Sequence, residues 1–225
     1  MKNKEVTRTL HTVADLHVRE AAQGEAESRT ITGYAILFNT PSVPLYEYDN
    51  EEEREVIAPS AVTQELLDAS DIKFTMYHNR QIILARSKCG SGTLKYRIDE
   101  KGVAFEFDAP KTADGDTALE LVRRGDISGC SFMFRTHYYD PAYVSRSVKR
   151  ENGRTIVTYT VNAITGIYDF TLAADPAYPD TSCEAEAREL FADLRKRSED
   201  SDDKTDKIRE QVREMRRAAS RKLIV

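Results

Sequence analysis

Short apolar and alternating runs, separated by turn-forming residues, dominate the chain as far as residue 173. Runs rich in β-branched and aromatic residues between Gly, Pro, Asn and Asp are typical of β-strands. The pattern predicts strands at Thr30–Asn39, Ile72–Tyr77, Ile82–Ala85, Thr93–Ile98, Val103–Phe107, Ile127–Thr136, Thr155–Val161 and Ile167–Ala173. The polar segment before them has enough apolar positions (Leu10, Val13, Leu16, Val18) for one edge strand.

Two helices and one clear hairpin punctuate these strands. The pattern predicts a helix over Ala61–Ala69 with Ser60 as its N-cap, and a second over Asp114–Arg124 with Gly125 as its C-cap. Asn152-Gly153 is the strongest hairpin-turn signal. The acidic stretch Glu47–Glu55 is expected to be a loop. Many short strands with few helices predict an α+β fold, a β-barrel or sandwich with helices outside.

The character of the chain changes in its last quarter. A helix is expected over Glu184–Arg197, followed by an acidic, solvated linker at residues 198–206. Residues 207–225 carry seven bases and two acids, with an apolar stripe at Ile208, Val212, Met215 and Ala219. This is the pattern of a basic amphipathic helix. Because the whole chain has a net charge of −5 and this segment has +5, residues 1–206 carry −10.

Composition limits the classes of protein to which the chain can belong. No apolar run is long enough for a membrane helix, and the N-terminus lacks the apolar core of a secretory signal. Three cysteines without CxxC spacing favour reduced thiols in a cytosol. The net charge of −5 argues against a general nucleic-acid binder. No phosphate-loop, dinucleotide, zinc-protease or calcium-loop motif is present, so no cofactor and no metal are expected.

Several segments together resemble the HK97-type prohead protease family of tailed phages. Those that carry the resemblance are Gly33–Ala35, Ile57–Ala61, Met76–Asn79, Leu84–Arg86, Gly92–Leu94, Asp99–Val103, Arg124–Phe134 and Tyr168–Tyr178. The resemblance covers about residues 30–182. It suggests a polar segment at 1–29, a protease domain at 30–182, a helix at 183–197, an acidic linker at 198–206 and a basic tail at 207–225.

The resemblance implies a fold and an activity as well. The fold would be a small β-barrel flanked by helices, like that of the herpesvirus assembly proteases. The activity would be serine endopeptidase cleavage of scaffold or capsid-protein extensions, and of the protease itself, inside the procapsid in the host cytoplasm. The expected partners are the capsid protein or scaffold and further copies of this chain, with no nucleic acid and no membrane. A catalytically silent assembly module with the same fold is the alternative.

The family's nucleophile and base fall on Ser131 and His78. In a strand Ser131, Met133 and Arg135 share one face while Phe132 and Phe134 share the other, so the phenylalanines can anchor the strand while Ser131 faces a cleft. Two residues compete as nucleophile. They are Ser128, on the opposite face, and Cys130, whose thiolate would be the stronger nucleophile.

The third catalytic position falls on Asp169, where the family more often has glutamate. An aspartate is one methylene shorter, which makes the reach to His78 the open question. A carboxylate in the otherwise apolar strand around Ile167 is costly unless it is paired, and His78 would be such a partner. His137 is the rival, because the herpesvirus relatives use a second histidine. Arg86 is expected either to order the oxyanion loop or hold substrate, or to form a surface salt bridge.

Overall fold

The computed structural model describes residues 5–13, 15–21, 27–48, 50–173, 190 and 192–197. Their strands form three sheets. The first sheet has the order β1 (Val6–Val13), β11 (Gly129–Thr136), β14 (Gly166–Ala173), β6 (Asp71–Met76), β7 (Asn79–Lys88), β8 (Ser91–Gly92). The second has the order β2 (His17–Val18), β3 (Thr30–Leu37), β10 (Gly102–Asp108), β9 (Lys95–Ile98). The third has the order β12 (Val144–Glu151), β13 (Arg154–Val161), β5 (Glu51–Ile57), β4 (Tyr46–Tyr48).

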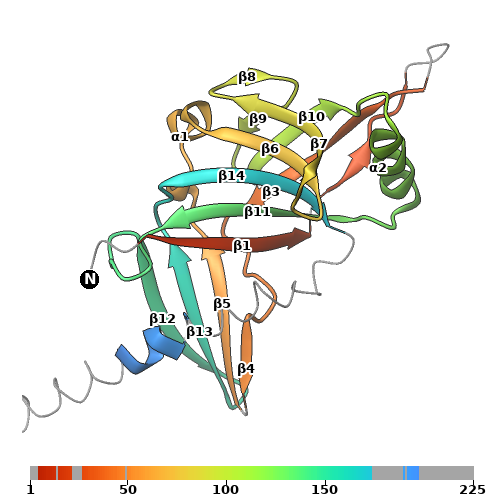
Figure 1. The fold of residues 1–225 in the computed structure, drawn as a ribbon. Helices are drawn as coiled ribbons and strands as arrows, with labels where there is room; N and C mark the ends of the chain where they lie inside the picture. Colours follow the sequence, from red (N-terminus) through yellow and green to blue (C-terminus); the bar gives the residue numbers. More distant parts are fainter. Residues whose placement is uncertain are drawn as a thin grey trace, which may run out of the picture. The chain divides into compact units, whose positions relative to one another are not determined.

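The first sheet carries the site, and its neighbouring strands β14, β11 and β1 lie side by side in Figure 1. Both β1 and β14 pair antiparallel with β11, whereas β14 and β6 are parallel. The N-terminal segment supplies two strands instead of the one expected edge strand. β1 forms one edge of this sheet, and β2, which holds Val18, forms an edge of the second sheet.

Aromatic side chains join the first and second sheets. The ring of Phe74 on β6 lies 4.5 Å from that of Phe105 and 4.6 Å from that of Phe107, both on β10. On β11 the rings of Phe132 and Phe134 are fully buried and stack 5.1 Å apart, as the strand alternation predicted. Each such side chain contributes about 1.5–3 kcal/mol by leaving water, so β11 is firmly held from its buried face.

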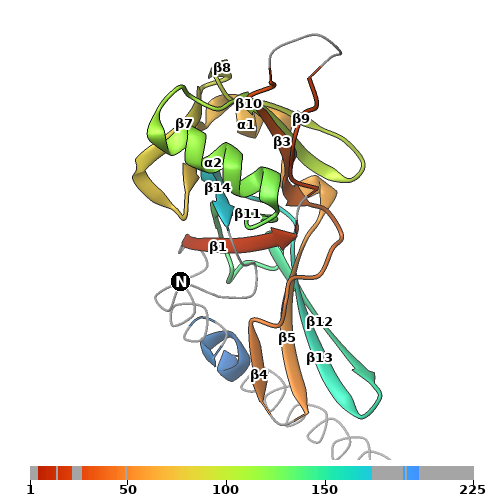
Figure 2. The same ribbon diagram turned by 90° about the vertical axis from the view of Figure 1, so that its right-hand side faces the viewer.

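Both predicted helices are present and begin close to their expected residues, but the predicted N-cap of the first helix is wrong. Helix α2 (Ala113–Arg124) ends at Gly125, which has φ 77° as a C-cap requires. It lies in front of the sheet ends in Figure 2 and leads into β11. Helix α1 (Gln64–Ala69) is capped by Thr63, whose hydroxyl accepts the Leu66 N–H at 3.2 Å. Ser60 is not the cap, because Pro59–Ala61 forms a separate 3₁₀ turn.

Two expectations about the fold are wrong in detail. The mixed α+β class is confirmed, but the strand pairing of the described residues gives three separate sheets and no closed barrel, since β1 and β8 end the first sheet as unjoined edges. The acidic stretch Glu47–Glu55 is not a loop: it supplies most of β4 and β5. Glu53 and Glu55 are fully buried there, and Glu55 accepts a hydrogen bond from Arg8 at 2.9 Å.

Little of the C-terminal region lies within the described residues. Residues 192–197 are helical, and Arg197 pairs with Asp193 one turn earlier at 3.0 Å. The remainder of the expected helix, the acidic linker and the basic tail lie outside the described residues, as does Cys183. In the part of the chain that the structure describes, no helix is long and apolar enough to cross a membrane.

Candidate active site

Strand pairing brings two of the three expected site residues onto one face of the first sheet. Ser131 on β11 lies opposite Thr171 on β14, and Met133 lies opposite Asp169. Side chains at i and i+2 share a face, so Ser131, Thr171 and Asp169 all project from the same side. The opposite side of β11 is the one that Phe132 and Phe134 bury in the core.

A tight turn delivers the third residue. Tyr77 and His78 are the two residues between β6 and β7, and Met76 pairs with Asn79 across the turn. Both have positive φ, 52° and 55°, as the two central residues of a type I′ hairpin do. Such turns prefer Asn and Gly, and non-glycine residues held there cost about 1–3 kcal/mol each. This strain is typical of functional sites, and the fold tolerates it because β14 holds the turn.

Two hydrogen bonds from the backbone of the turn fix its position over β14. The Tyr77 N–H donates to the Leu172 carbonyl at 3.1 Å, and the His78 N–H donates to the Thr171 hydroxyl at 3.0 Å. The imidazole of His78 is therefore placed above the strand that carries Asp169 and beside the strand that carries Ser131.

The three side chains form one continuous hydrogen-bonded chain. His78 Nε2 lies 2.8 Å from Ser131 Oγ, and His78 Nδ1 lies 2.9 Å from Asp169 Oδ1. Since Nδ1–H donates to a carboxylate, Nε2 is left as the acceptor for the serine proton. A hydroxyl, an imidazole and a carboxylate in this order can activate the hydroxyl oxygen as a nucleophile.

The Asp169 side chain is long enough to reach His78, although it is one methylene shorter than that of glutamate. Its side chain is only 2% exposed, so the carboxylate interacts with His78 in a poorly hydrated environment. Among the described residues, Oδ2 accepts no hydrogen bond. A buried carboxylate with so few partners is costly, and an imidazolium formed at His78 would relieve that cost.

Comparison with known proteins shows the family of the chain. The family model for the caudovirus prohead serine protease matches residues 14–195. The chain belongs to that family. Among solved structures, the capsid assembly protease gp21 of bacteriophage T4 is similar to this chain, with a TM-score of 0.37, 9% sequence identity, and coverage of 73% of this chain and 97% of that chain. No curated protein matches it.

The rival residues do not join the three. Ser128 is exposed in the segment before β11, and Cys130 points into the core, where burial raises the pKa of its thiol. His137 packs edge-on against Tyr143, with a ring separation of 4.6 Å. Arg86 donates two hydrogen bonds to Asp71, at 2.7 and 2.6 Å, which is the expected surface salt bridge.

Thr171 is the site residue that sequence reasoning missed. It is fully buried, pairs with Ser131 across the strands and accepts the His78 N–H. The available signal was its position two residues after Asp169, because that spacing puts both side chains on one face.

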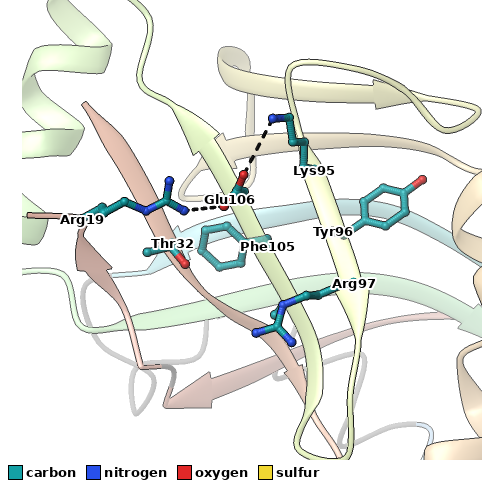
Figure 3. A pocket seen from close by; sticks show the side chains of 8 residues that line it. Arg19, Thr32, Lys95, Tyr96, Arg97, Phe105 and Glu106 are labelled. Carbon is teal, nitrogen blue, oxygen red and sulfur yellow. Dashed lines mark hydrogen bonds and ion pairs between the residues drawn. The ribbon is translucent and has the colours of Figure 1, made fainter. Parts of the chain in front are cut away.

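A separate hollow of about 480 Å³ lies on the second sheet. Figure 3 shows Glu106 between Arg19 and Lys95 there, with Arg97 nearby. None of the three site residues lines it. Within the described part of the chain, no group of three histidines, cysteines or carboxylates is arranged to hold a metal ion.

Proposed function

We propose that this chain is a serine endopeptidase that cleaves scaffold or capsid-protein extensions, and itself, inside the phage procapsid in the host cytoplasm. The observation that carries the proposal is the hydrogen-bonded chain from Ser131 through His78 to Asp169, with links of 2.8 and 2.9 Å. Membership of the prohead protease family supports the proposed class of substrate. Assembly with further copies of the chain, and no use of nucleic acid or membrane, are parts of the same proposal.

The geometry supports a two-step acyl transfer. Ser131 Oγ attacks the carbonyl carbon of the substrate while its proton moves to His78 Nε2. The resulting imidazolium is stabilised by Asp169, whose carboxylate accepts the hydrogen bond from Nδ1–H throughout. His78 then gives the Nε2 proton to the departing amine, leaving an ester on Ser131. A water molecule enters, gives its proton to His78 and hydrolyses the ester, which restores the hydroxyl.

Co-expression with the capsid protein of the same phage tests the proposal. We expect processing by the wild type, and its loss in both Ser131→Ala and His78→Ala. Cys130→Ala is the matched control, because it alters the neighbouring position on the opposite face of β11 and should retain processing. Processing that survives Ser131→Ala would refute the assignment.

The alternative of a catalytically silent assembly module predicts a different outcome. Under that alternative the wild type would process nothing, yet capsid assembly would still fail without it. Particle formation scored by electron microscopy beside capsid-protein cleavage scored by mass therefore separates the two functions. The buried Asp169–His78 pair favours the protease, since its imidazole also reaches the Ser131 hydroxyl and completes the arrangement that catalysis needs.

We further propose that self-cleavage near the acidic linker at residues 198–206 separates the protease from its basic tail. The tail, with five net positive charges, would dock on an acidic scaffold or capsid surface before that step. Mass spectrometry of mature particles should find the chain shortened at its C-terminal end. An intact C-terminus would contradict this part of the proposal.

A further inference from the structure

The nucleophile of the proposed protease is closed off by its own chain. Ser131 is 0% exposed, whereas the His78 side chain is 18% exposed. Besides His78, the Ser131 hydroxyl contacts the backbone carbonyl of Leu10 on β1, at 3.1 Å. A protease has to admit a peptide carbonyl to this hydroxyl, so the position of β1 bears directly on activity.

The strand order shows which side of Ser131 is obstructed. The first sheet runs β1-β11-β14-β6-β7, and His78 lies in the β6–β7 turn, so the imidazole reaches Ser131 from the β14 side. β1 borders Ser131 on the other side, with residue 11 directly opposite it in register. A substrate carbonyl would approach the hydroxyl from the side away from the base, where β1 runs beside β11 (Figure 1). The Leu10 carbonyl of β1 already contacts the hydroxyl there.

The same contact competes for the proton on which catalysis depends. A serine hydroxyl has one proton to donate. When Ser131 donates it to the Leu10 carbonyl, the proton is directed away from His78 Nε2, and general-base activation cannot begin. β1 thus both lies where the substrate would approach and competes with His78 for the serine proton.

A buried ion pair fastens β1 in this place. Arg8, whose side chain is 4% exposed, donates to the fully buried Glu55 of β5 at 2.9 Å. If β1 left the sheet, Glu55 would remain buried without this cation, which is unfavourable. The ion pair therefore favours the closed arrangement.

From these observations we propose that β1 (Val6–Val13) is an inhibitory strap: a strand that occupies the substrate position along β11 and has to leave before an extended peptide can pair there and reach Ser131. The inference rests on the proposed function and adds a regulatory element to it. The family match begins at residue 14, immediately after this strand. The strap therefore lies outside the residues that the family model matches.

A reversible cross-link in the full chain tests the strap. Thr9 and Met133 are opposed in register between β1 and β11, and opposed residues in antiparallel strands lie roughly 4.5–5.5 Å apart, within the span of a disulfide. Thr9→Cys/Met133→Cys, with Cys89 and Cys183 changed to Ser, would be compared oxidised and reduced. The readout is the rate at which a fluorophosphonate labels Ser131, followed by intact mass.

The control variant carries the same cross-link in a remote hairpin. Ser147→Cys/Thr158→Cys joins opposed residues of β12 and β13. Since labelling scales with the fraction of molecules in the competent state, oxidation of the strap variant should slow labelling at least about tenfold, while oxidation of the control should not. Equal labelling of the oxidised and reduced strap variants would overturn the proposal.

Two further measurements keep the test independent of the cysteine pair and of catalysis. Glu55→Gln weakens the ion pair without changing side-chain volume, and we expect it to speed labelling about tenfold; an unchanged rate counts against the strap. Hydrogen exchange should find the β1 amides exchanging at least about tenfold faster than those of β14. If the β1 amides exchange as slowly as those of β14, the strap proposal is wrong. If they exchange fast but Ser131 is never labelled, the strap proposal stands and the proposed protease function is wrong.

Discussion

Asp169→Asn is the sharpest test of the hydrogen-bonded chain. Asparagine has nearly the same volume as aspartate, so the buried site keeps its packing. Its amide, however, can present an N–H group to His78 Nδ1, which makes Nδ1 the acceptor and moves the imidazole proton to Nε2. In that tautomer His78 cannot take the proton of Ser131.

The structure allows an estimate of the loss. The Nδ1–Oδ1 distance is 2.9 Å and Asp169 is 2% exposed. Coulomb's law with an effective dielectric constant of about 20 gives roughly 6 kcal/mol for the imidazolium–carboxylate attraction at this separation. Each 1.36 kcal/mol is a factor of ten in rate, so we expect kcat to fall by about 10⁴-fold.

The assay is single-turnover cleavage of a capsid-protein fragment, with folding checked by circular dichroism. Asp71→Asn is the matched control, because it makes the same chemical change at a surface carboxylate that contacts Arg86 and none of the three site residues. It should leave kcat unchanged. If Asp169→Asn kept kcat within about threefold of the wild type, Asp169 would not be the orienting group.

Asp169→Glu distinguishes the charge from its placement. Glutamate keeps the charge but adds a methylene to a side chain that is almost fully buried, and overpacking of this kind costs about 1–3 kcal/mol of folding stability. We expect a destabilised protein with activity between those of the wild type and Asp169→Asn. Wild-type stability and full activity would show that the site has room for the longer side chain.

Two further predictions concern the support of the site and its periphery. Thr171→Val removes the acceptor of the His78 N–H, and leaving such a group unpaired costs about 1–3 kcal/mol; kcat should fall about tenfold with little change in KM, while Thr171→Ser should restore it. Hydrogen bonding from Arg86 lowers the pKa of Asp71 to about 2, below its ordinary value of 3.8. The pair therefore stabilises the fold above about pH 4 and loses that contribution as the pH falls through about 2. Because Asp71 is 39% exposed, screening should limit the effect of Asp71→Asn on urea unfolding to about 1 kcal/mol at pH 5. Most of this effect should be lost by pH 2, and an equal effect at both values would contradict the assignment.

Local patterns in the sequence predicted the features that depend on near neighbours. The alternation along β11 correctly put Phe132 and Phe134 in the core and Ser131 on the other face. Asn152-Gly153 forms the hairpin between β12 and β13. These succeed because period and turn chemistry are set within a few residues, where the sequence carries the physical cause.

The buried glutamates of β5 could not be predicted in the same way. A run of carboxylates is normally solvated, because burial without partners is costly. The compensating groups come from far along the chain: Arg8 lies 47 residues from Glu55, and the Tyr159 hydroxyl donates to Glu53 at 3.3 Å from 106 residues away. Glu53 and Tyr159 come together only because β5 pairs in parallel with β13.

The turn that holds His78 was hidden for a related reason. Tyr77 and His78 carry none of the Gly or Asn that announces a two-residue hairpin. Their left-handed backbone is maintained by β14, through the Leu172 carbonyl and the Thr171 hydroxyl. A conformation that is locally unfavourable and supported from another strand leaves no local signal in the sequence.

The same long-range pairing explains how the short side chain of Asp169 reaches His78. Parallel pairing puts Thr171 beside Thr75 and Leu172 beside Met76, so the chain that leaves β6 turns directly over β14. The two hydrogen bonds from the turn to β14 then hold the His78 backbone close to that strand. Because Asp169 projects from the same face two residues before Thr171, its shorter side chain already meets Nδ1 at 2.9 Å. The length of the side chain at position 169 is thus linked to how closely the His78 turn lies over β14. A longer carboxylate would require the turn to lie farther from that strand.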